Sequence, residues 1–169
     1  MLSNLDIDIR EGVDLPLDAE ELTRIADTVL AEEGVTRPCY VSVSIVDDDE
    51  MRELNLEWRG IDAATDVISL ECERPDDPDL SEDEPCELGD IVLAPAYITR
   101  QAARFETTPA DECRLLFVHG LLHLLGYDHI EEDEAQVMEA REDELVALVS
   151  TDADLSGVTL TRHRAGEDE

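Results

Sequence analysis

The chain has 169 residues, of which 43 % are apolar, and its formal net charge is −33. This length fits one domain, and the apolar fraction excludes a disordered acidic chain. All 12 basic residues are arginines, so the net charge repels nucleic acid, acidic membranes and other polyanions at long range. Because physiological salt screens charge beyond about 8 Å, a single arginine can still decide a contact. A surface adapted to high salt and an ordinary solvated acidic face explain this charge equally well.

No segment has the features of a membrane span or an export signal. No apolar run approaches the ~20 residues that cross a bilayer, and the N-terminus lacks the basic start and apolar stretch of a signal peptide. The four cysteines are scattered without a CxxC pair: Cys39, Cys72, Cys86 and Cys113. We therefore expect a cytoplasmic protein with reduced, mostly buried thiols, and a bridge between Cys72 and Cys86 is the less favoured alternative.

Strands and helices alternate in the first part of the chain. Residues 5–9 alternate apolar and acidic side chains, which predicts a strand with one wet face. An aspartate cap and a 3.6-residue apolar period predict a helix over 18–34, with a glycine as its stop. Strict alternation predicts a second strand over 39–46, and an acidic cap opens a short helix over 47–60. Residues 65–71 predict a third strand.

The second part begins with a loop and ends in helices. Residues 72–87 hold three prolines without apolar periodicity and predict an exposed loop. A fourth strand is expected over 88–95, and its final proline begins a helix over 95–104. A threonine cap followed by proline starts the next helix, 108–125. From 115 to 125 this helix is apolar on nearly every side, which predicts a buried central helix. An amphipathic helix over 131–149 comes last.

These elements predict an α+β or mixed α/β single domain over 1–150, with a sheet of about four strands and helices packed around the central helix. The last helix is expected to bury one apolar face, formed by Val137, Met138, Leu145, Val146 and Leu148. The polar tail, 151–169, contains His163 and is assigned no role. No glycine-rich phosphate loop follows any strand, so a Rossmann or Walker nucleotide site has no support.

Three of the chain's four histidines lie in the stretch FVHGLLHLLGYDH, at the end of the apolar helix. His119 and His123 are four residues apart and share one helical face, the geometry by which a helix offers two imidazoles to one metal ion. Gly126 lets the chain leave the helix sharply, and His129 follows three residues later. The resulting HxxxHxxGxxH spacing is that of the metzincin proteases.

Two interpretations of this cluster compete. A single histidine on an apolar face is usually a core residue bonded to the backbone, but three at this spacing would each need a partner, at roughly 1–3 kcal/mol for each unpaired group. Three neutral nitrogen ligands leave a fourth tetrahedral position for water, as in catalytic zinc, and such an ion lowers the pKa of its water to about 7. We therefore predict one Zn²⁺ held by His119, His123 and His129 plus water or substrate, with nickel or another divalent ion as the alternative.

Gly120 stands where the protease pattern carries its general base. In that pattern a glutamate follows the first histidine and activates the water. A peptidase of this design would have no base here, so proteolysis becomes a minor alternative. The proton acceptor or charge stabiliser must come from elsewhere in the chain, or the reaction must rely on zinc alone.

The segment HGLLHLLGYDH is similar to the HGxLHLxGYDH signature of the YbeY family of bacterial ribosomal-RNA maturation factors. Upstream, WRGIDAATDVIS resembles the family's arginine-glycine and threonine-aspartate-valine block, and LGDIVLA resembles its next strand. The resemblance covers about residues 5–149. It implies a zincin-like α+β fold and a metal-dependent single-strand endoribonuclease with one zinc on the three histidines.

The resemblance also implies a catalytic role for Arg59 and a supporting role for Asp66, which would orient Arg59 or a histidine. A guanidinium fork matches phosphate geometry, although an arginine that ends a helix is more often a solvated charge. For Asp66, a solvated acid at the end of a strand is an equal alternative. The chain departs from the family at Leu70 and Glu71, where phenylalanine and proline are usual.

Few arginines are candidates for phosphate contacts: Arg52, Arg59, Arg100, Arg104 and Arg114. We therefore expect weak RNA affinity for the isolated protein.

The function implied by the resemblance is zinc-dependent, single-strand-specific RNA cleavage in 16S ribosomal-RNA 3′-end maturation and ribosome quality control. The implied partners are single-stranded RNA, the small ribosomal subunit and ribosome-associated proteins, with no membrane or DNA partner. Two alternatives stay open: a metal-dependent hydrolase of another class, such as a peptidase or amidase, and a non-enzymatic ribosome assembly factor that contains structural zinc.

Overall fold

The structure is a computed structural model that describes residues 2–128 and 131–149. Its elements follow the order β1 (Ser3–Ile9), α1 (Ala19–Glu32), β2 (Cys39–Ile45), α2 (Asp48–Arg59), β3 (Val67–Glu71), β4 (Cys86–Leu93), α3 (Pro95–Arg104), α4 (Pro109–Leu124) and α5 (Glu132–Val149). Each predicted strand and helix is present within a few residues of its expected bounds. The polar tail, 151–169, lies outside the described residues.

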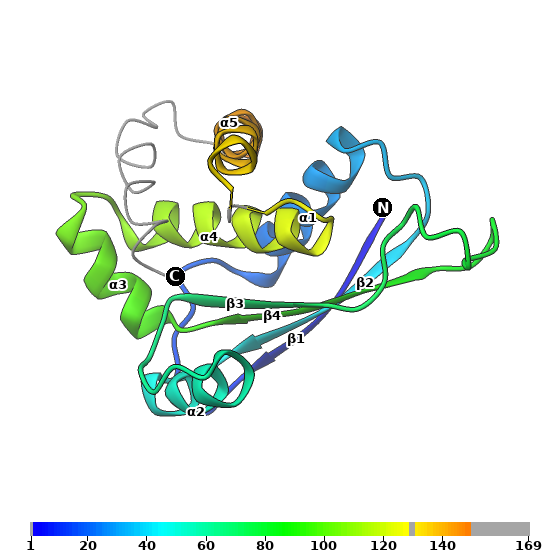
Figure 1. The fold of residues 1–169 in the computed structure, drawn as a ribbon. Helices are drawn as coiled ribbons and strands as arrows, with labels where there is room; N and C mark the ends of the chain where they lie inside the picture. Colours follow the sequence, from blue (N-terminus) through cyan, green and yellow to red (C-terminus); the bar gives the residue numbers. More distant parts are fainter. Residues whose placement is uncertain (1, 129–130, 150–169) are drawn as a thin grey trace.

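The four strands form one mixed sheet in the order β1-β2-β4-β3. β1, β2 and β4 run parallel, and β3 pairs with β4 in the antiparallel direction, from Val67 opposite Leu93 to Glu71 opposite Gly89. Helices α1, α4 and α5 lie on one side of this sheet and α2 on the other (Figure 1). The predicted α+β fold with a four-stranded mixed sheet is therefore confirmed, and β3 is its edge strand beside α4.

Helix α4 is the central helix that the apolar sequence predicted. Its N-cap is Thr108, whose side-chain oxygen accepts a hydrogen bond from the Asp111 backbone N–H at 3.1 Å, and Pro109 occupies the first turn. Its buried apolar side chains surround the helix: Cys113, Leu115, Leu116, Phe117, Val118, Leu121, Leu122 and Leu124. Because α4 packs on the sheet, on α1 and on α5, side chains at its C-terminal end have fixed surroundings.

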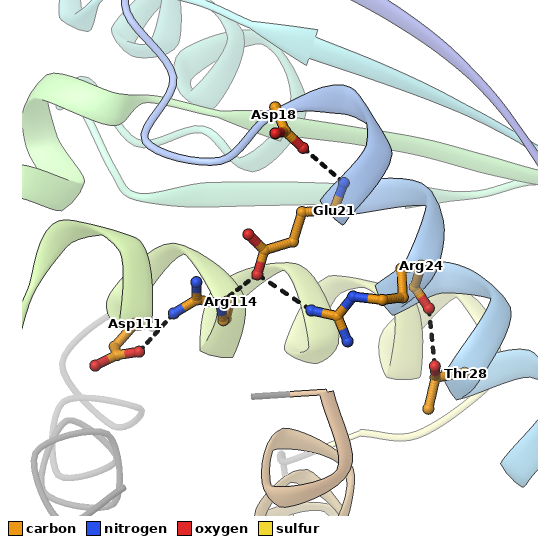
Figure 2. A network of polar contacts seen from close by, with 6 residues as sticks. All are labelled: Asp18, Glu21, Arg24, Thr28, Asp111 and Arg114. Atoms are coloured by element: carbon orange, nitrogen blue, oxygen red, sulfur yellow. Dashed lines mark hydrogen bonds and ion pairs between the residues drawn. The ribbon is translucent and has the colours of Figure 1, made fainter. Parts of the chain in front are cut away.

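A polar network fastens the first half of α4 to α1 (Figure 2). The Arg114 guanidinium, 14 % exposed, donates to the Glu21 carboxylate at 2.6 Å and to Asp111 at 2.7 Å. Arg24 donates to the same Glu21 carboxylate at 3.3 Å, and Asp18 caps α1 by accepting from the Glu21 backbone N–H. The network therefore sets the position of α4 relative to α1.

Helix α5 buries three of the five residues predicted for its core face, Met138, Leu145 and Val146. Val137 is 61 % exposed and Leu148 is 54 % exposed, so their assignment to the core was wrong. The residues that α5 buries are Met138, Glu142, Leu145, Val146 and Val149. These residues recur with the helical period, and Glu142 lies among them. Its carboxylate can be buried there because it has a partner on α4.

The cysteines and the fourth strand also refine the expectations. β4 begins at Cys86, two residues earlier than predicted, because Cys86 continues the pairing with Cys39 of β2. All four thiols are free, so a bridge between Cys72 and Cys86 is not formed, and only Cys72 is exposed.

Among the described helices none is long and apolar enough to cross a membrane.

Candidate metal centre

His119 and His123 lie one turn apart on the same face of α4. Their ring centroids are 4.6 Å apart with the ring planes at 80°, and their Nε2 atoms are 3.1 Å apart. His129, the predicted third ligand, lies outside the described residues. Within the described ranges no group of three histidine, cysteine, aspartate or glutamate side chains could hold a metal ion. The structure therefore brings together two of the three predicted ligands and leaves the third untested.

The His119 ring is held from α5. Its Nδ1 atom contacts the carboxylate of Glu142, whose side chain is 4 % exposed. A buried carboxylate is costly unless it is paired and hydrogen-bonded, and His119 supplies that partner. A carboxylate accepts, so the Nδ1 atom is the donor, which leaves the proton off Nε2 in a neutral ring.

The His123 ring is held by the turn that follows α4. Its Nδ1 atom donates to the backbone carbonyl of Tyr127 at 3.0 Å. Gly126 adopts a φ of +106°, and this conformation turns the chain so that the Tyr127 carbonyl faces back toward the ring. A carbonyl can only accept, so His123 also carries its proton on Nδ1 when neutral.

The donor set fits a metal ion. Two unprotonated Nε2 atoms facing each other at 3.1 Å would repel, unless a cation lies between them or one ring is an imidazolium. Two imidazole nitrogens on one tetrahedral zinc, each at 2.0–2.1 Å from the ion, are about 3.3 Å apart. An acceptor on the far nitrogen of each ring is also the usual arrangement around a metal-bound histidine. The chemistry and spacing of the pair therefore suit a divalent ion.

Gly120 faces the sheet. A Cβ atom built at this position would lie 3.3 Å from Cδ1 of Ile91 in β4. The glycine therefore permits the close approach of α4 to the sheet. A glutamate here would direct its side chain toward the sheet, which adds a packing reason for the absence of the protease base.

Comparison with known proteins identifies the family. The family model described as Endoribonuclease YbeY matches residues 8–150. The chain belongs to the YbeY endoribonuclease family. Endoribonuclease YbeY of Chloroflexus aurantiacus is 38 % identical over 151 residues, which cover 88 % of this chain and 97 % of that protein. Endoribonuclease YbeY of Moorella thermoacetica is 41 % identical over 145 residues, covering 82 % and 93 %.

The fold agrees with a solved structure as well. The solution structure of a Thermotoga maritima protein superposes with a TM-score of 0.58 at 26 % identity, covering 86 % of this chain and 89 % of that one. The resemblance drawn from the histidine signature is therefore confirmed at the level of family and fold.

The YbeY-family arginine and aspartate belong to other elements than the histidine pair. Arg59 is exposed on the last turn of α2, on the other side of the sheet from α4 (Figure 1). Asp66 is buried, which excludes the solvated-acid interpretation, and its carboxylate accepts from the Gln101 amide at 2.9 Å. The same amide donates to Glu112 at 3.1 Å, about two helical turns before His119. These bonds place the Asp66 carboxylate beside the first half of α4, whereas the histidines lie in its second half.

Arg74 is a neighbour of the site that the sequence interpretation missed. A Cβ atom built on Gly126 would lie 2.9 Å from Arg74 Nη1, so the guanidinium lies directly against the turn after α4. Arg74 Nη2 donates to the Glu71 carboxylate at 3.0 Å. Glu71 is one of the two positions at which the chain departs from the family. The residues 72–85 thus bring a cation to the end of the histidine helix.

Several of the arginines considered for phosphate contacts hold carboxylates in the described part of the chain. These pairs are Arg52 with Asp62, Arg100 with Asp48, and Arg114 with Glu21. An arginine that must exchange a carboxylate for a phosphate gains less from the new contact. The pairing therefore supports the prediction that the isolated protein binds RNA weakly.

Proposed function

We propose that this chain is a zinc-dependent endoribonuclease that cleaves single-stranded RNA in 16S ribosomal-RNA 3′-end maturation and ribosome quality control. Membership of the YbeY family supports the nuclease activity. The observation that carries the metal part is the 3.1 Å approach of the two Nε2 atoms, with an acceptor on Nδ1 of each ring.

In this proposal His119, His123 and His129 hold one Zn²⁺. A zinc ion with three histidine ligands supplies a Lewis acid for a phosphate oxygen and activates water near neutral pH. The residues of the chain supply the orientation: Glu142 and the Tyr127 carbonyl fix the rings with Nε2 toward the common point. The net charge of −33 adds a negative potential that favours a divalent cation.

Arg59 supplies the positive charge that binds the RNA phosphate in this proposal. Its place at the exposed end of α2 suits a guanidinium fork that contacts phosphate. Because α2 and α4 lie on opposite sides of the sheet, an RNA strand that contacts both would pass around an edge of the sheet, and β3 is the edge strand that contacts α4 (Figure 1). Such a path is compatible with an extended single strand.

The acidic surface affects how the RNA substrate reaches the site. A chain that carries −33 and pairs many of its arginines internally gains little from counterion release. We propose that the small ribosomal subunit or ribosome-associated proteins in the cytoplasm present the RNA, with no membrane or DNA partner. Their contacts would add the affinity that the isolated chain lacks.

The test is cleavage of a single-stranded RNA by the purified, zinc-loaded protein. His123→Ala is expected to abolish cleavage, and Arg59→Ala to slow it by about 100-fold if the guanidinium stabilises transition-state charge. Arg52→Ala is the matched control, because it removes the same charge from α2 at a residue that pairs with Asp62. Undiminished cleavage by His123→Ala would reveal a contaminating nuclease or a wrong site. Equal rates for the two arginine variants would remove Arg59 from the mechanism.

A further inference from the structure

Two neighbouring residues of α5 connect this helix to the histidine pair by different routes. Glu142 contacts Nδ1 of His119 directly. Arg141 begins a second route: its Nε donates to the Glu33 carboxylate at 2.5 Å, and its Nη2 donates to the Glu32 backbone carbonyl at 2.8 Å. The second route therefore passes first to the C-terminal end of α1.

The Glu33 carboxylate continues this route to His123. Its other oxygen accepts from the Tyr127 hydroxyl at 2.8 Å, while the Tyr127 backbone carbonyl accepts from His123 Nδ1 at 3.0 Å. The Glu33 side chain is only 13 % exposed, so these bonds are largely shielded from water. One tyrosine thus joins the end of α1 to the ring of the second histidine.

We propose that α5 positions both histidines, and that zinc binding and the docking of α5 on α1 and α4 are thermodynamically coupled. The inference rests on the proposed zinc site. Glu142 is the positioning residue for His119, and Arg141 positions His123 through Glu33 and Tyr127. Neither α5 residue touches the ion or the RNA.

The coupling follows from the buried stripe of α5. An apolar stripe formed by Met138, Leu145, Val146 and Val149 docks the helix, and Glu142 interrupts it with a carboxylate. That carboxylate is tolerated when its hydrogen bond is made, and a cation on the far side of the His119 ring strengthens the bond by polarising the imidazole. Linkage is reciprocal, so a docked α5 that raises zinc affinity is itself stabilised by zinc to the same extent.

Zinc affinity measured by competition with a chromophoric chelator tests the two routes separately. Glu142→Gln is expected to weaken zinc binding by about 10- to 100-fold, the range seen when a partner of a metal-bound histidine is lost. Glu132→Gln makes the same charge change on an exposed residue in the first turn of α5 and is expected to retain the wild-type affinity. Tyr127→Phe, which removes only the hydroxyl, is expected to weaken binding by a smaller factor, and Tyr40→Phe on the exposed Tyr40 is its control.

Hydrogen exchange of α5 amides with and without zinc separates positioning from a purely structural role. Zinc is expected to slow exchange across the buried part of α5 in the wild type and in the two control variants, and to slow it less in Glu142→Gln. Tyr127→Phe keeps the test informative if Glu142→Gln does not fold. A wild type that binds no zinc overturns the proposed metal site itself. If the wild type binds zinc, and Glu142→Gln and Tyr127→Phe bind it with unchanged affinity, the positioning role alone is overturned. It is also overturned if zinc leaves the exchange of the α5 amides unchanged.

Discussion

The Nε2 atoms of His119 and His123 lie 3.1 Å apart, and each ring has an acceptor on its other nitrogen. One helical turn supplies the separation of the rings, and tertiary contacts supply their rotation. Contacts within the protein therefore orient both rings. Ligand side chains held in one orientation leave less reorganisation for the binding step, which favours a tight site.

Zinc is expected to raise the melting temperature of the wild-type protein and to leave that of His123→Ala nearly unchanged. At a free zinc concentration of 100 times Kd, the expected gain in the free energy of unfolding is about 2.7 kcal/mol. Thermal unfolding followed by circular dichroism, with and without a chelator, measures the shift. Magnesium at equal concentration is the control, because an acidic surface attracts any divalent ion. A zinc shift that survives in His123→Ala would locate the binding elsewhere.

Gly120→Glu is expected to destabilise the fold without creating a peptidase. The first atom of the new side chain would lie 3.3 Å from Cδ1 of Ile91, and the carboxylate would be directed at the sheet. The cost in unfolding free energy is expected to exceed about 3 kcal/mol in urea unfolding. Gly120→Ala is the control, since a gain in helix propensity of about 1 kcal/mol offsets the tight contact of one added methyl group with Ile91. Casein hydrolysis by Gly120→Glu would contradict the direction assigned to this position.

Local sequence signals predicted the histidine pair because its geometry is local. One helical turn brings His119 and His123 together. The threonine cap and the glycine that ends this helix can both be recognised in the sequence. The strands followed in the same way from alternation and β-branched residues. The family signature then extended the prediction to fold and activity class.

The supports of the pair could not be predicted from local signals. Glu142 lies 23 residues from His119, and its contact depends on how α5 docks. The predicted core face omitted Glu142 and included the exposed Val137 and Leu148, because a buried carboxylate is not expected without knowledge of its partner. The one signal was its spacing, four residues after Met138 and three before Leu145. Likewise, local signals could not predict that the sheet separates Arg59 from α4, because that separation depends on the topology of the whole domain.

Gly126→Ala is expected to lower both stability and zinc affinity. A φ of +106° strains any other residue, and the added Cβ would lie 2.9 Å from Arg74 Nη1, so a loss of about 1–3 kcal/mol is expected. The turn would then shift the Tyr127 carbonyl that holds His123. Gly12→Ala is the matched control, with a φ of +80° and open space around its Cβ. Urea unfolding and chelator competition should show a stability loss in both variants and an affinity loss only in Gly126→Ala.

Cys113 is expected to make the protein less stable in alkaline solution. Burial on α4 raises the pKa of this thiol from 9.0 to about 12. The folded state therefore holds the proton more tightly than the unfolded state, so the stabilisation is complete below pH 9 and is lost as the pH rises toward 12. Across that window one such group contributes a slope of about 1.4 kcal/mol per pH unit. Urea unfolding at several pH values should show a shallower decline for Cys113→Ala than for the wild type. Cys72→Ala, at the exposed thiol, should decline as the wild type does, and equal slopes for all three proteins would contradict the assignment.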